Sequence, residues 1–62
     1  MTQVLRTVVV DDSEDIRALW CATLGRSLAF EICGVAADGP TAVEVVRREQ
    51  PDVVLLDRRC PA

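Results

Sequence analysis

The chain has 62 residues, of which ten are acidic and seven are basic, giving a formal net charge of −3. A chain of this length can form one small domain, and its negative balance argues against direct binding of nucleic acid, which requires a basic surface. The sequence has no histidine, which excludes imidazole ligands, and its three scattered cysteines indicate reduced thiols rather than a disulfide framework or a zinc site. It shows neither a signal-peptide pattern nor an apolar stretch of membrane-spanning length, so we expect a cytoplasmic protein without a membrane partner.

The first part of the chain predicts a strand followed by a helix. Residues 6–10 are mostly β-branched, as expected of a central parallel strand, and the run ends abruptly at Asp11 and Asp12. Ser13 is a typical N-cap, and the two acids after it suit the positive end of a helix. This helix should end near residues 26–27. One apolar face of it is formed by Ile16, Leu19, Trp20, Thr23 and Leu24.

Two further strands and a second helix follow. Residues 30–36 alternate loosely between apolar and polar, and the turn of residues 38–40 starts a helix that ends before Pro51. Residues 52–57 form a third, apolar strand that ends in Asp57. The inward side of the second helix should hold Ala42, Val45, Val46 and Glu49. The β-α-β-α-β order predicts an α/β fold with a parallel sheet and right-handed crossovers.

Three carboxylates follow strands of this predicted sheet. Asp11 and Asp12 come at the end of the first strand and Asp57 at the end of the third, and functional sites of parallel α/β sheets lie at the carboxyl ends of strands. If these strands are neighbours, the three carboxylates converge, and their repulsion requires a cation or a proton between them. Mg²⁺ is suited to such a site because it takes oxygen ligands and leaves room for a phosphate oxygen. A carboxylate beside Mg²⁺ can act as a nucleophile towards phosphorus.

Three ordered segments of the chain resemble response-regulator receiver domains of two-component signalling. They are the first strand with its acidic pair, residues 8–15, the turn at residues 37–39, and the strand and loop of residues 51–61. The resemblance covers nearly the whole chain and implies the amino-terminal half of a receiver. The implied fold is an incomplete doubly wound, flavodoxin-like sheet with strand order 2-1-3. Residues 1–62 would then be one truncated receiver domain.

For this chain, the resemblance implies a phosphorelay that uses Mg²⁺ as its cofactor. Asp57 would receive a phosphoryl group from the phosphohistidine of a sensor histidine kinase. Asp12 would bind Mg²⁺ directly and Asp11 mostly through water, while Asp57 and the backbone carbonyl of Arg59 would complete the protein ligands. The segment would be a signalling module and not an enzyme with turnover on small substrates.

The chain departs from the receiver pattern after Asp57. Arg58 stands where an aliphatic residue is usual, and Cys60 stands where methionine is common. Receivers continue through two further strands that bear a Ser or Thr hydroxyl and a Lys, both contacting the phosphoryl group, and the five residues after Asp57 contain neither strand. We therefore expect impaired phosphorylation, an exposed apolar edge at the third strand, and self-association or a receiver dimer.

Two other functions remain open. The first is a non-phosphorylated binding module that pairs with an intact receiver or a kinase. The second is a phosphotransferase of the haloacid-dehalogenase type, which also uses a strand-ending aspartate. The sequence speaks against it, because its signature has a second aspartate two residues later, where this chain has Arg59. No glycine-rich loop follows the first strand, which speaks against nucleotide binding.

Several conspicuous residues also have a purely structural interpretation. Asp12 and Ser13 could simply cap the first helix. Trp20 and Phe30 are expected to serve in packing, and Cys33 to be a small core residue.

Overall fold

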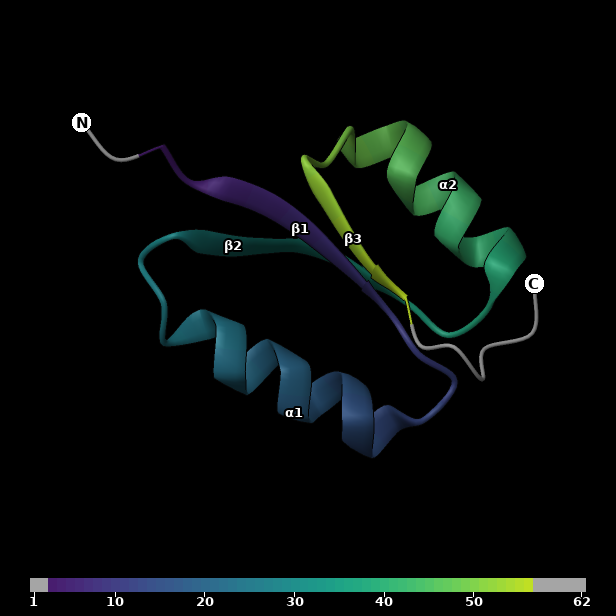
Figure 1. The fold of residues 1–62 in the computed structure, drawn as a ribbon. Helices are drawn as coiled ribbons and strands as arrows, with labels where there is room; N and C mark the ends of the chain where they lie inside the picture. Colours follow the sequence, from purple (N-terminus) through teal and green to yellow (C-terminus); the bar gives the residue numbers. More distant parts are fainter. Residues whose placement is uncertain (1–2, 57–62) are drawn as a thin grey trace.

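The structure, a computed structural model, describes residues 3–56 and shows the expected alternation of strands and helices (Figure 1). The elements are β1 (Leu5–Val10), α1 (Glu14–Gly25), β2 (Phe30–Ala36), α2 (Gly39–Glu49) and β3 (Val53–Leu56). The predicted helix ends are nearly correct, since Arg26 is the C-cap of α1 and Gln50, just before Pro51, is the C-cap of α2. The predicted α/β class is confirmed.

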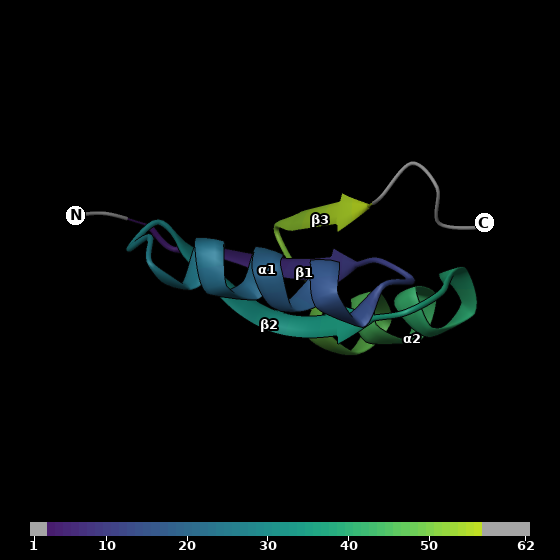
Figure 2. The same cartoon turned by 90° about the horizontal axis from the view of Figure 1, so that it is seen from below.

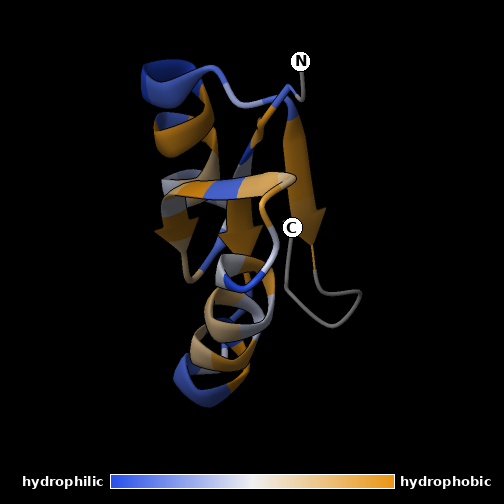
Figure 3. Ribbon diagram, turned by 90° about the vertical axis from the view of Figure 1, so that its left-hand side faces the viewer, coloured by the Kyte–Doolittle hydropathy of each residue, from blue (hydrophilic) through white to orange (hydrophobic). Residues whose placement is uncertain are grey.

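The three strands form one parallel sheet in the order β2-β1-β3, which confirms the predicted strand order. Figure 3 shows the three arrowheads pointing the same way, with apolar colour at their carboxyl ends. At the end of β1, Val10 is in register with Ala36 of β2 and with Leu56 of β3. The residues that follow Val10 therefore leave the sheet between its two neighbouring strands.

The central strand β1 is the core of the fold. The two helices lie on opposite faces of the sheet (Figures 1 and 2), so β1 is covered from both sides. Val8 and Val10 form a buried cluster with Ala36 and with Val45 of α2, and Val9 is buried on the opposite face of the pleat. The valine run was therefore correctly interpreted as a strand buried on both faces.

Helix α1 packs less deeply than its apolar face predicts. It carries no fully buried residue, and although Ile16 and Leu24 are half-buried, Leu19 and Trp20 are 61% and 43% exposed. The expectation that Trp20 is a packing residue is thus wrong for the described part of the chain. The physical reason is that α1 contacts β1 and β2, and no other described element covers the side of the helix that carries Leu19 and Trp20.

Strand β3 is one of the two edge strands of the described sheet, the other being β2. It pairs with β1 but contacts neither helix within residues 3–56, and Figure 2 shows it apart from both. Val54 and Leu56 are exposed on it. An apolar edge strand of this kind is a template for pairing with another chain, as expected from the sequence.

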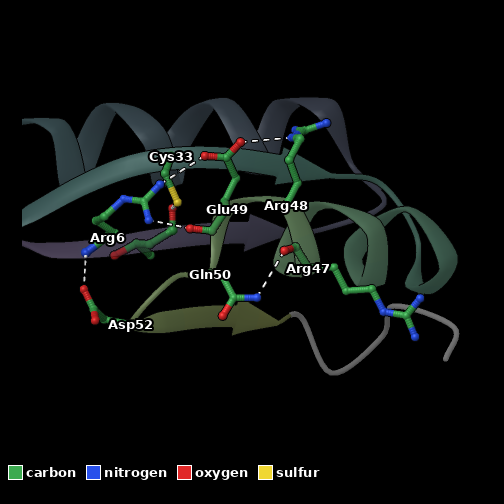
Figure 4. A network of polar contacts seen from close by, with 8 residues as sticks. Arg6, Cys33, Arg47, Arg48, Glu49, Gln50 and Asp52 are labelled. Carbon is green, nitrogen blue, oxygen red and sulfur yellow. Dashed lines mark hydrogen bonds and ion pairs between the residues drawn. The ribbon is translucent and has the colours of Figure 1, made fainter.

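A polar clamp joins the amino ends of β1 and β3 to the end of α2 (Figure 4). The main chain of Arg6 donates to Asp52 Oδ2 at 2.9 Å and accepts from the Asp52 backbone N–H at 2.8 Å. The Arg6 guanidinium donates to Glu49 Oε1 at 3.0 Å and to the Glu49 carbonyl, while Arg48 pairs with Glu49 Oε2 at 2.9 Å. Glu49 is thus bonded to arginine side chains, and Asp52 to the main chain of Arg6.

A bulge interrupts the pairing of β2 with β1. Thr7 is in register with Ile32 but Val8 with Gly34, so Cys33 is the extra residue. The Cys33 thiol lies 3.5 Å from the carbonyl oxygen of Thr7, to which it donates. Cys33 is half-buried and packs against the core cluster, in agreement with its expected core role.

At Gly34, β2 approaches α2 too closely for a larger side chain, and this close contact can be tested by substitution. A Cβ built on Gly34 would lie 2.6 Å from Val45 Cγ1. We expect Gly34→Ala to lower the free energy of unfolding by about 1–3 kcal/mol, because one of the two elements must move. Urea denaturation followed by circular dichroism measures this.

Two variants control this measurement. Gly25→Ala should cause no loss, since a Cβ there meets nothing within 4 Å. The double variant Gly34→Ala/Val45→Ala should lose less free energy of unfolding than the two single variants lose together, because Val45→Ala removes the clashing methyl group. Equal losses from Gly34→Ala and Gly25→Ala would contradict the packing described.

Candidate functional site

The acidic pair lies at the carboxyl end of the central strand, as the sequence predicted. Asp11 follows Val10 directly and is 2% exposed, whereas Asp12 is exposed. The Asp11 backbone N–H donates to the Ala36 carbonyl at 3.1 Å and so extends the pairing with β2 by one residue. The rigid sheet therefore fixes the main chain where the acids begin.

Asp11 is held by two further hydrogen bonds. Its Oδ1 accepts from the Ser13 backbone N–H at 2.9 Å, which closes a tight turn. Its carbonyl oxygen accepts from Arg17 Nη1 at 2.7 Å, so a side chain on α1 reaches back to the end of β1. The N–H, the carbonyl and the carboxylate of Asp11 each have a partner.

Ser13 and Asp12 have different local roles. Ser13 is the N-cap of α1, with its hydroxyl accepting from the Ile16 N–H at 3.4 Å. The Asp12 carboxylate takes part in none of the hydrogen bonds or ion pairs of residues 3–56. The structural interpretation of this pair thus holds for Ser13 but not for Asp12, whose carboxylate is available for another partner.

Neither acid of the pair takes part in an ion pair within the described part of the chain. The ion pairs among residues 3–56 are Arg6–Glu49 and Arg48–Glu49, and neither involves Asp11 or Asp12. A buried carboxylate is costly unless a cation or several hydrogen bonds compensate it. The donors offered here are carboxylate oxygens, which suit a hard ion such as Mg²⁺.

Asp38 is a third acid at the same rim, two residues beyond β2. It is the N-cap of α2, and its Oδ1 accepts from the Thr41 N–H at 2.8 Å. Hydrogen bonds from the Thr41 backbone and then from its side chain hold the pKa of the Asp38 carboxyl below its ordinary value of 3.8. The Asp38 carboxylate therefore serves to cap α2.

The remaining predicted site residues lie outside the described residues. They are the expected phosphoacceptor Asp57 and the expected metal ligand Arg59. Arg58 and Cys60, the two departures from the receiver pattern, also lie there. Within residues 3–56, no group of three or more acidic or cysteine side chains lies close enough together to hold a metal ion. The described part of the predicted site is the acid turn, by which we mean residues 11–13.

Arg17 was missed by the sequence reasoning. It stands four residues after the N-cap Ser13, one helical turn along α1, and this spacing is the only signal that could have found it. Its partner is a main-chain oxygen, which has no residue-type signature.

Comparison with known proteins places the chain in a family. Residues 7–62 match the response regulator receiver domain. The chain is 40% identical over 57 residues to protein-glutamate methylesterase/protein-glutamine glutaminase 2 of Anaeromyxobacter dehalogenans, covering 92% of this chain and 17% of that protein. It is also 40% identical over 57 residues to a protein of the same description from Pyrococcus abyssi, covering 92% and 16%.

A solved structure agrees with these matches. The signal receiver domain of the putative response regulator NarL from Mycobacterium tuberculosis has a TM-score of 0.89 and 37% sequence identity to this chain. The match covers 97% of this chain and 48% of that one. This chain therefore belongs to the response-regulator receiver family of two-component signalling, and it spans about a sixth of the length of the curated relatives named above. Neither helix among residues 3–56 is long and apolar enough to cross a membrane.

The cap made by Asp38 predicts how acid affects α2. Because the folded pKa lies below the ordinary value of 3.8, the charged cap stabilises the fold fully above that value and loses its contribution as the pH falls through the lower, folded pKa. Urea titrations from neutral pH to below pH 3.8 should show this loss.

Asp38→Asn is the matched control, since asparagine also caps helices but does not titrate in this range. The difference in free energy of unfolding between wild type and Asp38→Asn should shift against the wild type as acid is added, because only the wild-type cap loses its charge. An advantage that grows in acid would contradict the assignment of the cap.

Proposed function

We propose that this chain is the phosphoacceptor part of a receiver module. Asp57 accepts a phosphoryl group from the phosphohistidine of a sensor histidine kinase in an Mg²⁺-dependent transfer. The module acts in the cytoplasm as a signalling element rather than as an enzyme with turnover. Membership of the receiver family supports this role.

One observation carries the proposal. Val10 is in register with Leu56, and both residues are followed in the sequence by an aspartate, Asp11 and Asp57. Two adjacent parallel strands thus end at the same rim of the sheet, where ligands of such sheets bind, and each is followed in the sequence by an aspartate. The carboxylate of Asp12, bonded to no other described residue, adds a further oxygen donor.

The transfer itself is a simple displacement at phosphorus. A carboxylate oxygen of Asp57 forms a new P–O bond while the P–N bond to the kinase imidazole breaks, and the imidazole leaves with that electron pair. Mg²⁺, when bound, offsets the negative charge of the incoming group. The acid turn would hold it through Asp12 directly and Asp11 through water, and the backbone carbonyl of Arg59 would be a further ligand.

The activity of the named relatives is not part of the proposal for this chain. Two of them are named as methylesterases and glutaminases, but this chain matches only 16–17% of their length. We carry over from them the receiver role alone.

A second function is favoured by the open strand β3. Because β3 contacts neither helix and exposes Val54 and Leu56, it offers an edge to an intact receiver or to a second copy of the chain. In that case the chain would be a binding module that associates without phosphorylation.

Incubation with acetyl phosphate and Mg²⁺, followed by intact mass measurement, tests the first function. We expect a slowly accumulating adduct of one phosphoryl group per chain, absent in Asp57→Asn. Asp12→Asn should slow its formation by about tenfold or more, because it removes a proposed metal ligand. The adduct should also disappear when Mg²⁺ is chelated.

Asp52→Asn is the matched control for these changes. It removes a carboxylate at the opposite rim, beside Arg6, and should leave the rate of adduct formation unchanged. An adduct that survives in Asp57→Asn would sink the proposal. No adduct in any variant, with binding to an intact receiver independent of the phosphate donor, would establish the second function instead.

A further inference from the structure

Arg17 links helix α1 to the acid turn through both its backbone and its side chain. Its backbone N–H donates to the Ser13 carbonyl at 3.0 Å, and its guanidinium donates to the Asp11 carbonyl at 2.7 Å. One residue therefore contacts both ends of the acid turn. No carboxylate of residues 3–56 forms an ion pair with Arg17. Among these residues, its guanidinium bonds to a main-chain carbonyl instead.

The bond from Arg17 completes the fixation of Asp11. The β2 carbonyl of Ala36 accepts from its N–H at 3.1 Å, and the Ser13 N–H donates to its carboxylate at 2.9 Å. The peptide plane between Asp11 and Asp12 carries the Asp11 carbonyl, so a donor on that oxygen fixes the direction in which the chain leaves towards Asp12. The orientation of Asp12 thus depends on a contact to its neighbour.

We propose that Arg17 is a positioning residue for cation binding by the acid turn. It holds the Asp11 carbonyl and thereby aims both carboxylates at the rim of the sheet. The inference rests on the proposed Mg²⁺-dependent function and adds to it a residue that touches neither the ion nor the phosphoryl group.

The charge of Arg17 and its positioning role predict opposite effects on cation affinity when the residue is made neutral. A guanidinium close to a divalent cation repels it, so by charge alone the neutral variant Arg17→Met would bind the cation more tightly. By positioning, the same variant binds more weakly, because the acid turn loses one of its supports. The sign of the change therefore separates the two effects.

Arginine is better suited to this task than lysine. Its planar guanidinium presents several N–H donors in a fixed geometry, whereas the lysine ammonium is a compact charge on a flexible stem. Arg17→Lys keeps the charge and should recover only part of the cation affinity lost in Arg17→Met.

The experiment measures Mn²⁺ binding to the chain by electron paramagnetic resonance. We expect Arg17→Met to weaken the affinity by about tenfold, the range found for outer contacts of metal sites, with Arg17→Lys in between. Arg26→Met removes the same charge at the other end of α1 and should leave the affinity unchanged. An unchanged or increased affinity in Arg17→Met overturns the inference.

A second readout uses the metal-free protein. Hydrogen exchange of the Ser13 amide, which is bonded to Asp11 Oδ1, should accelerate in Arg17→Met while the amide of Val9 in the core keeps its protection. Equal acceleration at both amides would show a general loss of stability and overturn the positioning role. If Arg17→Met does not fold, Arg17→Lys is the deciding variant. The inference is then overturned if Arg17→Lys binds Mn²⁺ with wild-type affinity and its Ser13 amide exchanges at the wild-type rate.

Asp12→Asn separates this inference from the proposed function. If it weakens Mn²⁺ binding while Arg17→Met does not, the function stands and the role of Arg17 fails. If wild-type protein binds no Mn²⁺, or Asp12→Asn leaves the binding unchanged, the proposed function fails and the role of Arg17 fails with it.

Discussion

The fold depends on one constraint, which is the burial of β1 between two parallel neighbours and two helices. Val8, Val9 and Val10 are each at most 1% exposed, and a slip of the strand by one residue would move a polar residue from one of its ends into a position that a buried valine now fills. The register with β2 and β3 is fixed by this burial. The place where the acids leave the sheet is therefore decided by which residues are buried in β1.

The acids at the two rims of the sheet have different contacts. At the amino rim, Arg6 contacts Glu49 and Asp52, and these contacts tie three elements together. At the carboxyl rim, Asp11 and Asp12 make no ion pair with another described residue, and the nearby Arg17 bonds to a carbonyl instead of a carboxylate. The ion pairs of the described residues thus lie at the amino rim, whereas the acids of the carboxyl rim are free of them.

Much of the fold could be predicted because its signals are local. The valine run of residues 8–10, the cap at Ser13 and the turn before α2 each follow from residue type and spacing. The alternation of elements then predicted the fold class, whereas the strand order was implied by the resemblance to receiver domains. The contacts of Arg17 with Asp11 could not be predicted, since a main-chain acceptor leaves no mark in the sequence. The exposure of Trp20 was mispredicted because helical periodicity shows which residues share a face, but not whether another element covers that face. The metal site, inferred from carboxylates that follow neighbouring strands, and the phosphoacceptor role implied by the resemblance remain predictions.

We propose that the acid turn binds a divalent cation at the carboxyl rim of the sheet together with Asp57. Paramagnetic broadening of backbone amide signals by substoichiometric Mn²⁺ can locate this ion, because the broadening falls steeply with distance from it. We expect the strongest broadening at Asp11, Asp12 and Asp57. Broadening centred on Asp52 at the opposite rim, or spread evenly over the surface acids, would contradict it.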